Sequence, residues 1–215
     1  MVAINQEAFD RPETLKLASG QQLGRLRHFD HGDGYSPDGG LNGGIIAPKR
    51  LLIPAGTTLV RFGGSPWRDA RPFVPKVASG EWWLDWPNYR TVERHADKLG
   101  ESVAYAIRHL CAVPDDWSDM SFLIQGVTRS PLLAYTGEGR AAVTKTATID
   151  PRSAGKPRLD QLFIPGLSSP DLRKQAILIR GQTFLDPAMS KAGALAKKRA
   201  NDAMQARLRA AVPGR

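Results

Sequence analysis

The chain has 215 residues, a length that suits one domain with a sizeable hydrophobic core. Its single cysteine, Cys111, excludes an intramolecular disulfide and a zinc site built from cysteines. The formal net charge of +9 favours an anionic partner such as a nucleic acid, an acidic protein surface or a phosphorylated small molecule.

The N-terminus, MVAINQEAFDRPET, lacks the basic and then apolar pattern of a signal peptide. No apolar run in the sequence approaches the roughly 20 residues that a membrane-spanning helix needs. We therefore expect synthesis in the cytoplasm and no membrane association. Delivery to another cell would then require a dedicated secretion system.

Residues 1–48 are rich in turn-forming residues, above all in HGDGYSPDGGLNGG, and predict an irregular, glycine-rich N-terminal arm. Within this arm, His28-Phe29-Asp30-His31-Gly32-Asp33 brings together imidazoles and carboxylates that could bind a divalent metal. We assign no metal site, because glycine-rich loops of this composition commonly occur without one and no further ordered ligand is evident.

Residues 49–186 predict a domain in which strands surround one main helix. The helix is expected at 88–112, where apolar residues recur at intervals of three and four, and Gly100 could divide it. Strands are expected at 51–53, 57–62, 79–86, 121–127, 132–135, 141–149, 159–166 and 176–184. Between them, 63–78 predicts a proline-rich loop, and the glycines of 135–140 predict a hairpin turn.

The tail, residues 187–215, is rich in strong helix formers and predicts a basic C-terminal helix. Seven of its residues are Lys or Arg and one is Asp, so most of the excess positive charge of the chain falls here. Nucleic-acid binding through the tail is one reading, although no aromatic residue interleaves with the lysines.

Arg61 and three nearby tryptophans suggest a ligand cleft. Arg61 ends an apolar strand and is followed by Gly63, where the backbone can come close to a bound phosphate or carboxylate. Trp82 and Trp83 offer flat, rigid walls for a stacked ring. The alternative is structural, with the tryptophans in the core and Arg61 in an ion pair.

One helix inserted in a run of strands predicts an α+β domain of two small packed antiparallel sheets with a cleft between them. The cues come in a set order: an early-strand arginine, an aromatic strand that leads into a helix, and a late strand of the form polar-x-apolar-apolar-x-Pro. In this order the chain resembles the ADP-ribosyltransferase family, in particular its small bacterial toxin-like members.

The resemblance covers about Leu51 to Phe184 and implies a set of site residues. It implies that Arg61 holds the pyrophosphate or ribose of NAD, and that Trp82 or Trp83 lines the nicotinamide pocket. In place of the family's Ser-Thr-Ser motif this chain has only Ser79 and Asp85 as nearby polar residues. In the late strand, 159–165, Gln161 occupies the position of the catalytic glutamate, with Asp160 beside it.

Glutamine at position 161 keeps a hydrogen bond to the ribose and loses the charge that opposes the cation formed there. About 3 kcal/mol of transition-state stabilisation should be lost with that charge, a rate loss of roughly a hundredfold or more. Three explanations stay open. Asp160 or Glu138 supplies the carboxylate, the chain is an inactivated enzyme, or the fold has been reused for binding. Neighbouring strand residues point to opposite faces, so only one of Asp160 and Gln161 can face the cleft.

The resemblance implies NAD-dependent transfer of ADP-ribose to a macromolecular acceptor, a protein or a nucleic acid. It further implies a bacterial toxin or effector, with an immunity protein as a partner. A close alternative is an NAD glycohydrolase, in which water replaces the acceptor. A second alternative is a non-catalytic basic protein that binds nucleic acid through its tail. A nuclease or other hydrolase is a weaker third, because the four histidines offer no recognisable acid-base pair.

Overall fold

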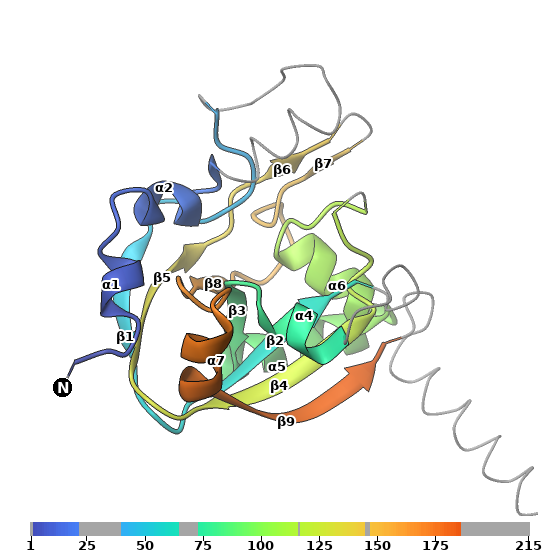
Figure 1. The fold of residues 1–215 in the computed structure, drawn as a ribbon. Helices are drawn as coiled ribbons and strands as arrows, with labels where there is room; N and C mark the ends of the chain where they lie inside the picture. Colours follow the sequence, from blue (N-terminus) through green and yellow to red (C-terminus); the bar gives the residue numbers. More distant parts are fainter. Residues whose placement is uncertain (1, 22–39, 65–72, 116, 145–146, 186–215) are drawn as a thin grey trace, which may run out of the picture.

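The computed structural model describes residues 2–21, 40–64, 73–115, 117–144 and 147–185 (Figure 1). Within these residues the chain builds one seven-stranded antiparallel sheet, in the order β1-β5-β8-β3-β2-β4-β9, and a separate two-stranded ribbon. The large sheet consists of β1 (Lys49–Ile53), β5 (Leu132–Glu138), β8 (Asp160–Phe163), β3 (Trp82–Asp85), β2 (Thr58–Gly63), β4 (Phe122–Thr128) and β9 (Ile177–Phe184).

Six helices in the described residues accompany the sheet. They are α1 (Gln6–Phe9), α2 (Thr14–Ala18), α4 (Phe73–Ala78), α5 (Trp86–Leu99), α6 (Val103–Leu110) and α7 (Pro170–Ala176). The α+β class expected from the sequence is confirmed. None of the helices in the described residues is long and apolar enough to cross a membrane.

The expected pair of separate sheets is replaced by two halves joined through β3. One half contains β1, β5 and β8, and the other contains β2, β4 and β9. Because β3 has only four residues, it pairs with each half over two positions. The register pairs are Leu59 with Asp85, Val60 with Leu84, Trp82 with Phe163, and Trp83 with Leu162.

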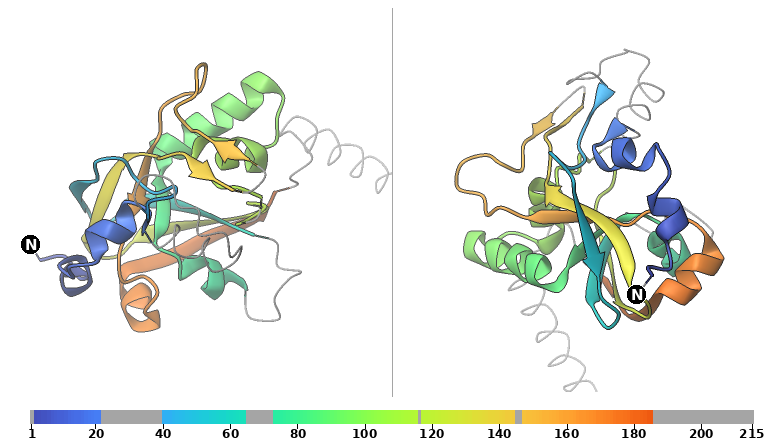
Figure 2. Two further views of the ribbon diagram at one scale, coloured as in Figure 1. Left: turned by 90° about the horizontal axis from the view of Figure 1, so that it is seen from above. Right: turned by 90° about the vertical axis from the view of Figure 1, so that its left-hand side faces the viewer.

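The strands around β3 are buried on both faces. On one face, Leu59, Trp83 and Ile124 pack in the same cluster as residues of α4 and α7. On the other face, Val60 and Leu84 pack against α5 and α6. The left view of Figure 2, from above, shows the sheet between these two pairs of helices. Successive strand residues therefore serve two hydrophobic cores, as the period of two along a strand requires.

The expected main helix is divided in two, as Gly100 suggested. Gly100 ends α5 in the left-handed conformation with φ 67°, which glycine adopts at little cost. Ser102 then begins α6, where its side chain accepts a hydrogen bond from the amide of Tyr105. At the other end of α5, the Asp85 side chain accepts a hydrogen bond of 2.9 Å from the amide of Asn88.

Asp85→Ala is expected to lower the free energy of unfolding by about 1 kcal/mol, because the first turn of α5 loses its capping acceptor. Urea-induced unfolding measures the change. Asp85→Asn keeps a capping oxygen and should stay close to the wild-type stability. An equal loss in both variants would show that the carboxylate charge, and not the cap, stabilises this helix.

Three local predictions were wrong. Residues 73–78, expected in a loop, form α4, because Pro75 lies in the first helical turn, where proline is tolerated. The expected hairpin turn at 135–140 is largely strand, because β5 continues to Glu138 and pairs with β8. The single strand expected at 141–149 is two short strands, β6 (Ala142–Val143) and β7 (Thr148–Ile149), paired with each other.

The described parts of the predicted N-terminal arm contain two short helices and contribute to the interior. The buried Asn5 side chain donates hydrogen bonds to the carbonyls of Leu133 and Pro165, and it accepts one from the amide of Leu133. Ile45 is fully buried. The His- and Asp-containing segment at 28–33, to which no metal site was assigned, and the predicted C-terminal helix at 187–215 lie outside the described residues.

Candidate ligand-binding site

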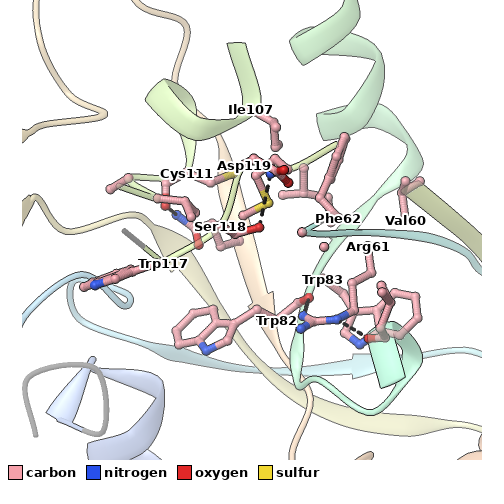
Figure 3. A pocket seen from close by; sticks show the side chains of 18 of the residues that line it. Val60, Arg61, Phe62, Trp82, Trp83, Ile107, Cys111, Trp117, Ser118 and Asp119 are labelled. Carbon is pink, nitrogen blue, oxygen red and sulfur yellow. Dashed lines mark hydrogen bonds between the residues drawn. The ribbon is translucent and has the colours of Figure 1, made fainter. Parts of the chain in front are cut away.

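A cavity of about 430 Å³ lies where β3 joins the two halves of the sheet. Its wall combines the end of β2, the start of β3, α4, the segment 111–120 that follows α6, and Gln161 from β8. Figure 3 shows Arg61, Trp82 and Trp83 on one side of this space and Cys111, Ser118 and Asp119 on the other. The volume is within the range of small-molecule sites, roughly 300 to 1,000 Å³.

Arg61 lines the cavity and also holds the local backbone together. Its Nε donates to the carbonyl of Val77, and its Nη1 donates to the carbonyl of Trp82 (Figure 3). Burial lowers the pKa of Arg61 to about 10, and the nearby carboxylate of Glu81 opposes part of that shift. The guanidinium therefore remains a cation at neutral pH, in a place where its field is poorly screened.

Gly80 provides the space in which the Arg61 guanidinium lies. A Cβ added at Gly80 would stand 1.7 Å from Nη2 and 2.0 Å from the guanidinium carbon. The backbone of Gly80 is not in the left-handed region, so the absence of a side chain here is a requirement of space and not of conformation. Nothing in the sequence around Gly80 indicates this role.

The structure separates the roles of the tryptophans. Trp83 is only 3% exposed, packs in the core and donates from its indole nitrogen to the carbonyl of Gly80. Trp82 is half-buried and packs against Phe163, with the two ring centroids 5.0 Å apart. Trp117, which the sequence analysis did not select, is also half-buried and lines the cavity. Among the described residues of the wall, Trp82 and Trp117 are thus the indoles with surface left to offer a ligand ring.

Gln161 lies at the cavity wall and is only 7% exposed. Its side-chain amide donates to the carbonyl of Cys111 at 3.3 Å. Gly139 leaves room for it, because a Cβ there would stand 2.4 Å from Nε2 of Gln161. Although they are 100 positions apart in the chain, Arg61 and Gln161 therefore line the same cavity.

The two acids considered as substitutes for the catalytic glutamate lie outside this cavity. Asp160 is exposed, on the opposite side of β8 from Gln161, as the strand alternation requires. Glu138 is exposed at the end of β5, with its carboxylate 3.9 Å from the Nε of Arg158. Neither side chain contributes to the wall.

Of the three remaining residues from the sequence analysis, one lines the cavity. Gly63 does so, and a Cβ added there would stand 2.8 Å from the side chain of Val77. Ser79 instead donates to the carbonyl of Lys76 at the end of α4. Asp85 is the cap of α5 described above, and neither it nor Ser79 is part of the wall.

The connection between α6 and β4 also contributes to the wall, although its sequence predicts no site. It brings Trp117, Ser118 and Asp119 to the cavity. Asp119 is the one carboxylate among the described residues of the wall, and the cations there are Arg61 and Lys76. A tryptophan within a short polar connection was the available signal.

Cys111 also lines the cavity, but its chemistry is inert. Burial raises the pKa of its thiol to about 12, so the thiolate is not available as a nucleophile at neutral pH. The described residues also contain no cluster of three or more His, Cys, Asp or Glu that could hold a metal ion.

Together these residues define an α+β protein with a small-molecule pocket at the junction of two half-sheets. The pocket offers a buried cation, two half-exposed indoles, a buried amide and one carboxylate. Such a set suits a ligand that carries both an anionic group and a flat ring.

No protein family model matches the chain, and no curated protein does. Among solved structures, one described as Rhs1-CT in complex with cognate immunity protein RhsI1 has a TM-score of 0.38 and 12% identity, over 65% of this chain and 83% of that one. A second, of Tne2 in complex with Tni2, has a TM-score of 0.37 and 17% identity, over 64% of this chain and 92% of that one. Similarity at this level assigns neither fold family nor function.

Proposed function

We propose that the pocket binds NAD and that the protein cleaves the bond between nicotinamide and ribose, passing ADP-ribose to water or to a macromolecular acceptor. One observation carries the proposal. Arg61 and Gln161, from strands on opposite sides of β3, line one cavity together with Trp82 and Trp117.

Each group has a role that its chemistry supports. The Arg61 cation would attract the pyrophosphate through N–H groups other than those that donate to Val77 and Trp82. The indoles of Trp82 and Trp117 would stack on a ring of the dinucleotide. Gln161 would hydrogen-bond a ribose hydroxyl, which fixes the ribose for loss of nicotinamide.

In the proposed reaction the bond between the nicotinamide nitrogen and ribose C1′ breaks. The bonding electron pair goes to the ring nitrogen, so nicotinamide leaves as a neutral molecule. The cationic ribose carbon then takes the oxygen of water, which releases a proton, and free ADP-ribose forms. In the transferase version, a nucleophile of the acceptor replaces water and loses the proton.

The burial of Gln161 favours water as the acceptor. With 7% of its surface exposed, Gln161 lies deep in the wall, and the reacting ribose would lie beside it. A water molecule reaches such a position more readily than a side chain of a folded protein does. Hydrolysis is thus the version that we favour, and transfer to a protein or nucleic acid is the alternative outcome of the test below.

The test has two parts. The first measures nicotinamide release when the purified protein is incubated with labelled NAD alone, and the second adds a cell lysate and measures transfer of the label to macromolecules. We expect release that needs no lysate, and a loss of about a hundredfold or more in Gln161→Ala. Gln182→Ala, an exposed glutamine on β9, is the matched control and should keep full activity. Label on lysate macromolecules would indicate transfer. Absence of both binding and cleavage by the wild-type protein would contradict the proposal.

The wider role that we propose is that of a toxin or effector that destroys NAD in a target cell. Such a protein would need delivery by a secretion system and an immunity protein to protect the producing cell. These partners stay predictions, as does nucleic-acid binding by 187–215, which lies outside the described residues.

A further inference from the structure

No anionic side chain of β8 faces the pocket in which the proposed reaction takes place. A cation develops on the ribose as nicotinamide leaves, and a nearby carboxylate is the group best suited to oppose it. Gln161 is neutral, and Asp160 and Glu138 lie outside the wall. Among the described residues that line the pocket, Asp119 carries the carboxylate.

Asp119 is held in place by its own neighbours. Its Oδ1 accepts hydrogen bonds from the amide of Ser121 at 3.1 Å and from the hydroxyl of Ser121 at 2.8 Å. A Cβ added at Gly64 would stand 3.6 Å from the same oxygen, so the carboxylate lies close to the end of β2. Figure 3 shows Asp119 across the pocket from Arg61.

The segment that carries Asp119 is bounded by two unusual backbone conformations. Ala112 has φ 53° and Met120 has φ 51°, values in the left-handed region that residues with a side chain rarely adopt. Strain of this kind is concentrated at functional sites, where the surrounding structure maintains it. Between these two residues, the segment contributes Val113, Trp117, Ser118 and Asp119 to the wall.

We infer that Asp119 is a catalytic residue, whose carboxylate opposes the positive charge that forms on the ribose of NAD. The inference rests on the proposed function. It divides the charges of the pocket between the two ends of the ligand, with Arg61 and Lys76 toward the pyrophosphate and Asp119 toward the ribose carbon. The carboxylate forms no covalent bond in this step, and the atoms and electrons move as described above.

Asp119→Asn is the sharpest test, because asparagine keeps an oxygen that can accept the two hydrogen bonds from Ser121 and loses the charge. We expect kcat for nicotinamide release to fall by about a hundredfold or more, while KM changes by less than about threefold. The midpoint of thermal unfolding should stay close to that of the wild-type protein. Asp10→Asn, an exposed aspartate at the end of α1, is the control and should keep wild-type kinetics.

The outcomes separate the inference from the function on which it rests. If the wild-type protein cleaves NAD and Asp119→Asn keeps its kcat, the inference alone is overturned. A change in KM with an unchanged kcat also overturns it, because the charge would then act in binding only. Loss of kcat in Asp160→Asn and not in Asp119→Asn assigns the role to the other acid. If the wild-type protein neither binds nor cleaves NAD, both fail.

Discussion

Replacing Arg61 with alanine is expected to lower the free energy of unfolding by about 3 kcal/mol and to abolish ligand binding. The guanidinium donates to the carbonyls of Val77 and Trp82, and hydrogen bonds from a charged group contribute roughly 1.5 to 3 kcal/mol each. Both carbonyls would lose this donor, although relief from burying a charge offsets part of the cost. Urea-induced unfolding and calorimetric titration with NAD measure the two effects.

Arg61→Ala removes the guanidinium altogether, so it does not test whether the position of this group matters for the ligand. Gly80→Ala tests that position. The new methyl group would stand 1.7 Å from Nη2, so the guanidinium must move while its charge stays in the protein. We expect NAD affinity or turnover to fall on the order of a hundredfold.

Gly181→Ala is the matched control for the added methyl group, because the nearest atoms to a Cβ at Gly181 are 3.8 Å away, at ordinary contact distance. It should behave as the wild-type protein does. If Gly80→Ala binds NAD normally, the position of the guanidinium does not matter for the ligand, and Arg61 has a structural role only.

Gln161→Glu is expected to destabilise the folded protein by about 2 kcal/mol at neutral pH. The amide of Gln161 donates to the carbonyl of Cys111, and a carboxylate in its place cannot donate and repels that oxygen. The position is also buried, which disfavours a charge. Glutamine is therefore the residue that fits this wall.

The stability of Gln161→Glu relative to the wild-type protein should fall as the pH rises. Burial and the facing carbonyl raise the pKa of a carboxyl group in the folded state above its unfolded value of about 4.3. Below that unfolded pKa the protonated acid can donate to Cys111, and the penalty is small. As the pH rises, the unfolded state loses its proton first, so the stability of the variant relative to wild type falls.

Measurements of unfolding at about pH 4 and about pH 8 test this dependence. Gln161→Met removes the hydrogen bond without adding a charge, and its deficit should be nearly the same at both pH values. A deficit in Gln161→Glu that does not depend on pH would mean that the carboxylate reaches solvent and that the wall opens at this position.

The sequence predicted the longer strands well, because each carries its own apolar pattern and turn signals. The short helices α4 and α7 were not predicted, because six or seven residues show no helical periodicity and the prolines in them are typical of loops. The prediction of a hairpin turn and a single strand over 135–149 was also wrong. Two of its glycines are needed to leave space for the side chains of Gln161 and Ile45. In the sequence, glycines required by tertiary packing cannot be told from glycines required by a turn.

The site was predictable only in part. The sequence pointed to Arg61, Gly63, Trp82, Trp83 and Gln161, and the structure places all five at one cavity. Their roles stay predictions. Asp119 could not be found in this way, because an aspartate in a polar connection usually contacts only solvent. Its place in the wall depends on how α6 and β4 pack, which no local pattern encodes.

The way in which β3 joins the two half-sheets also affects when the protein can fold during its synthesis. The chain crosses between the two half-sheets from β1 to β2, again from β4 to β5, and again from β8 to β9. A growing polypeptide therefore completes neither half early. Gln161 emerges late and β9 later still, and pairing of such distant segments is slow. On a ribosome-bound chain the cavity would therefore stay incomplete until nearly all of the described residues had been synthesised.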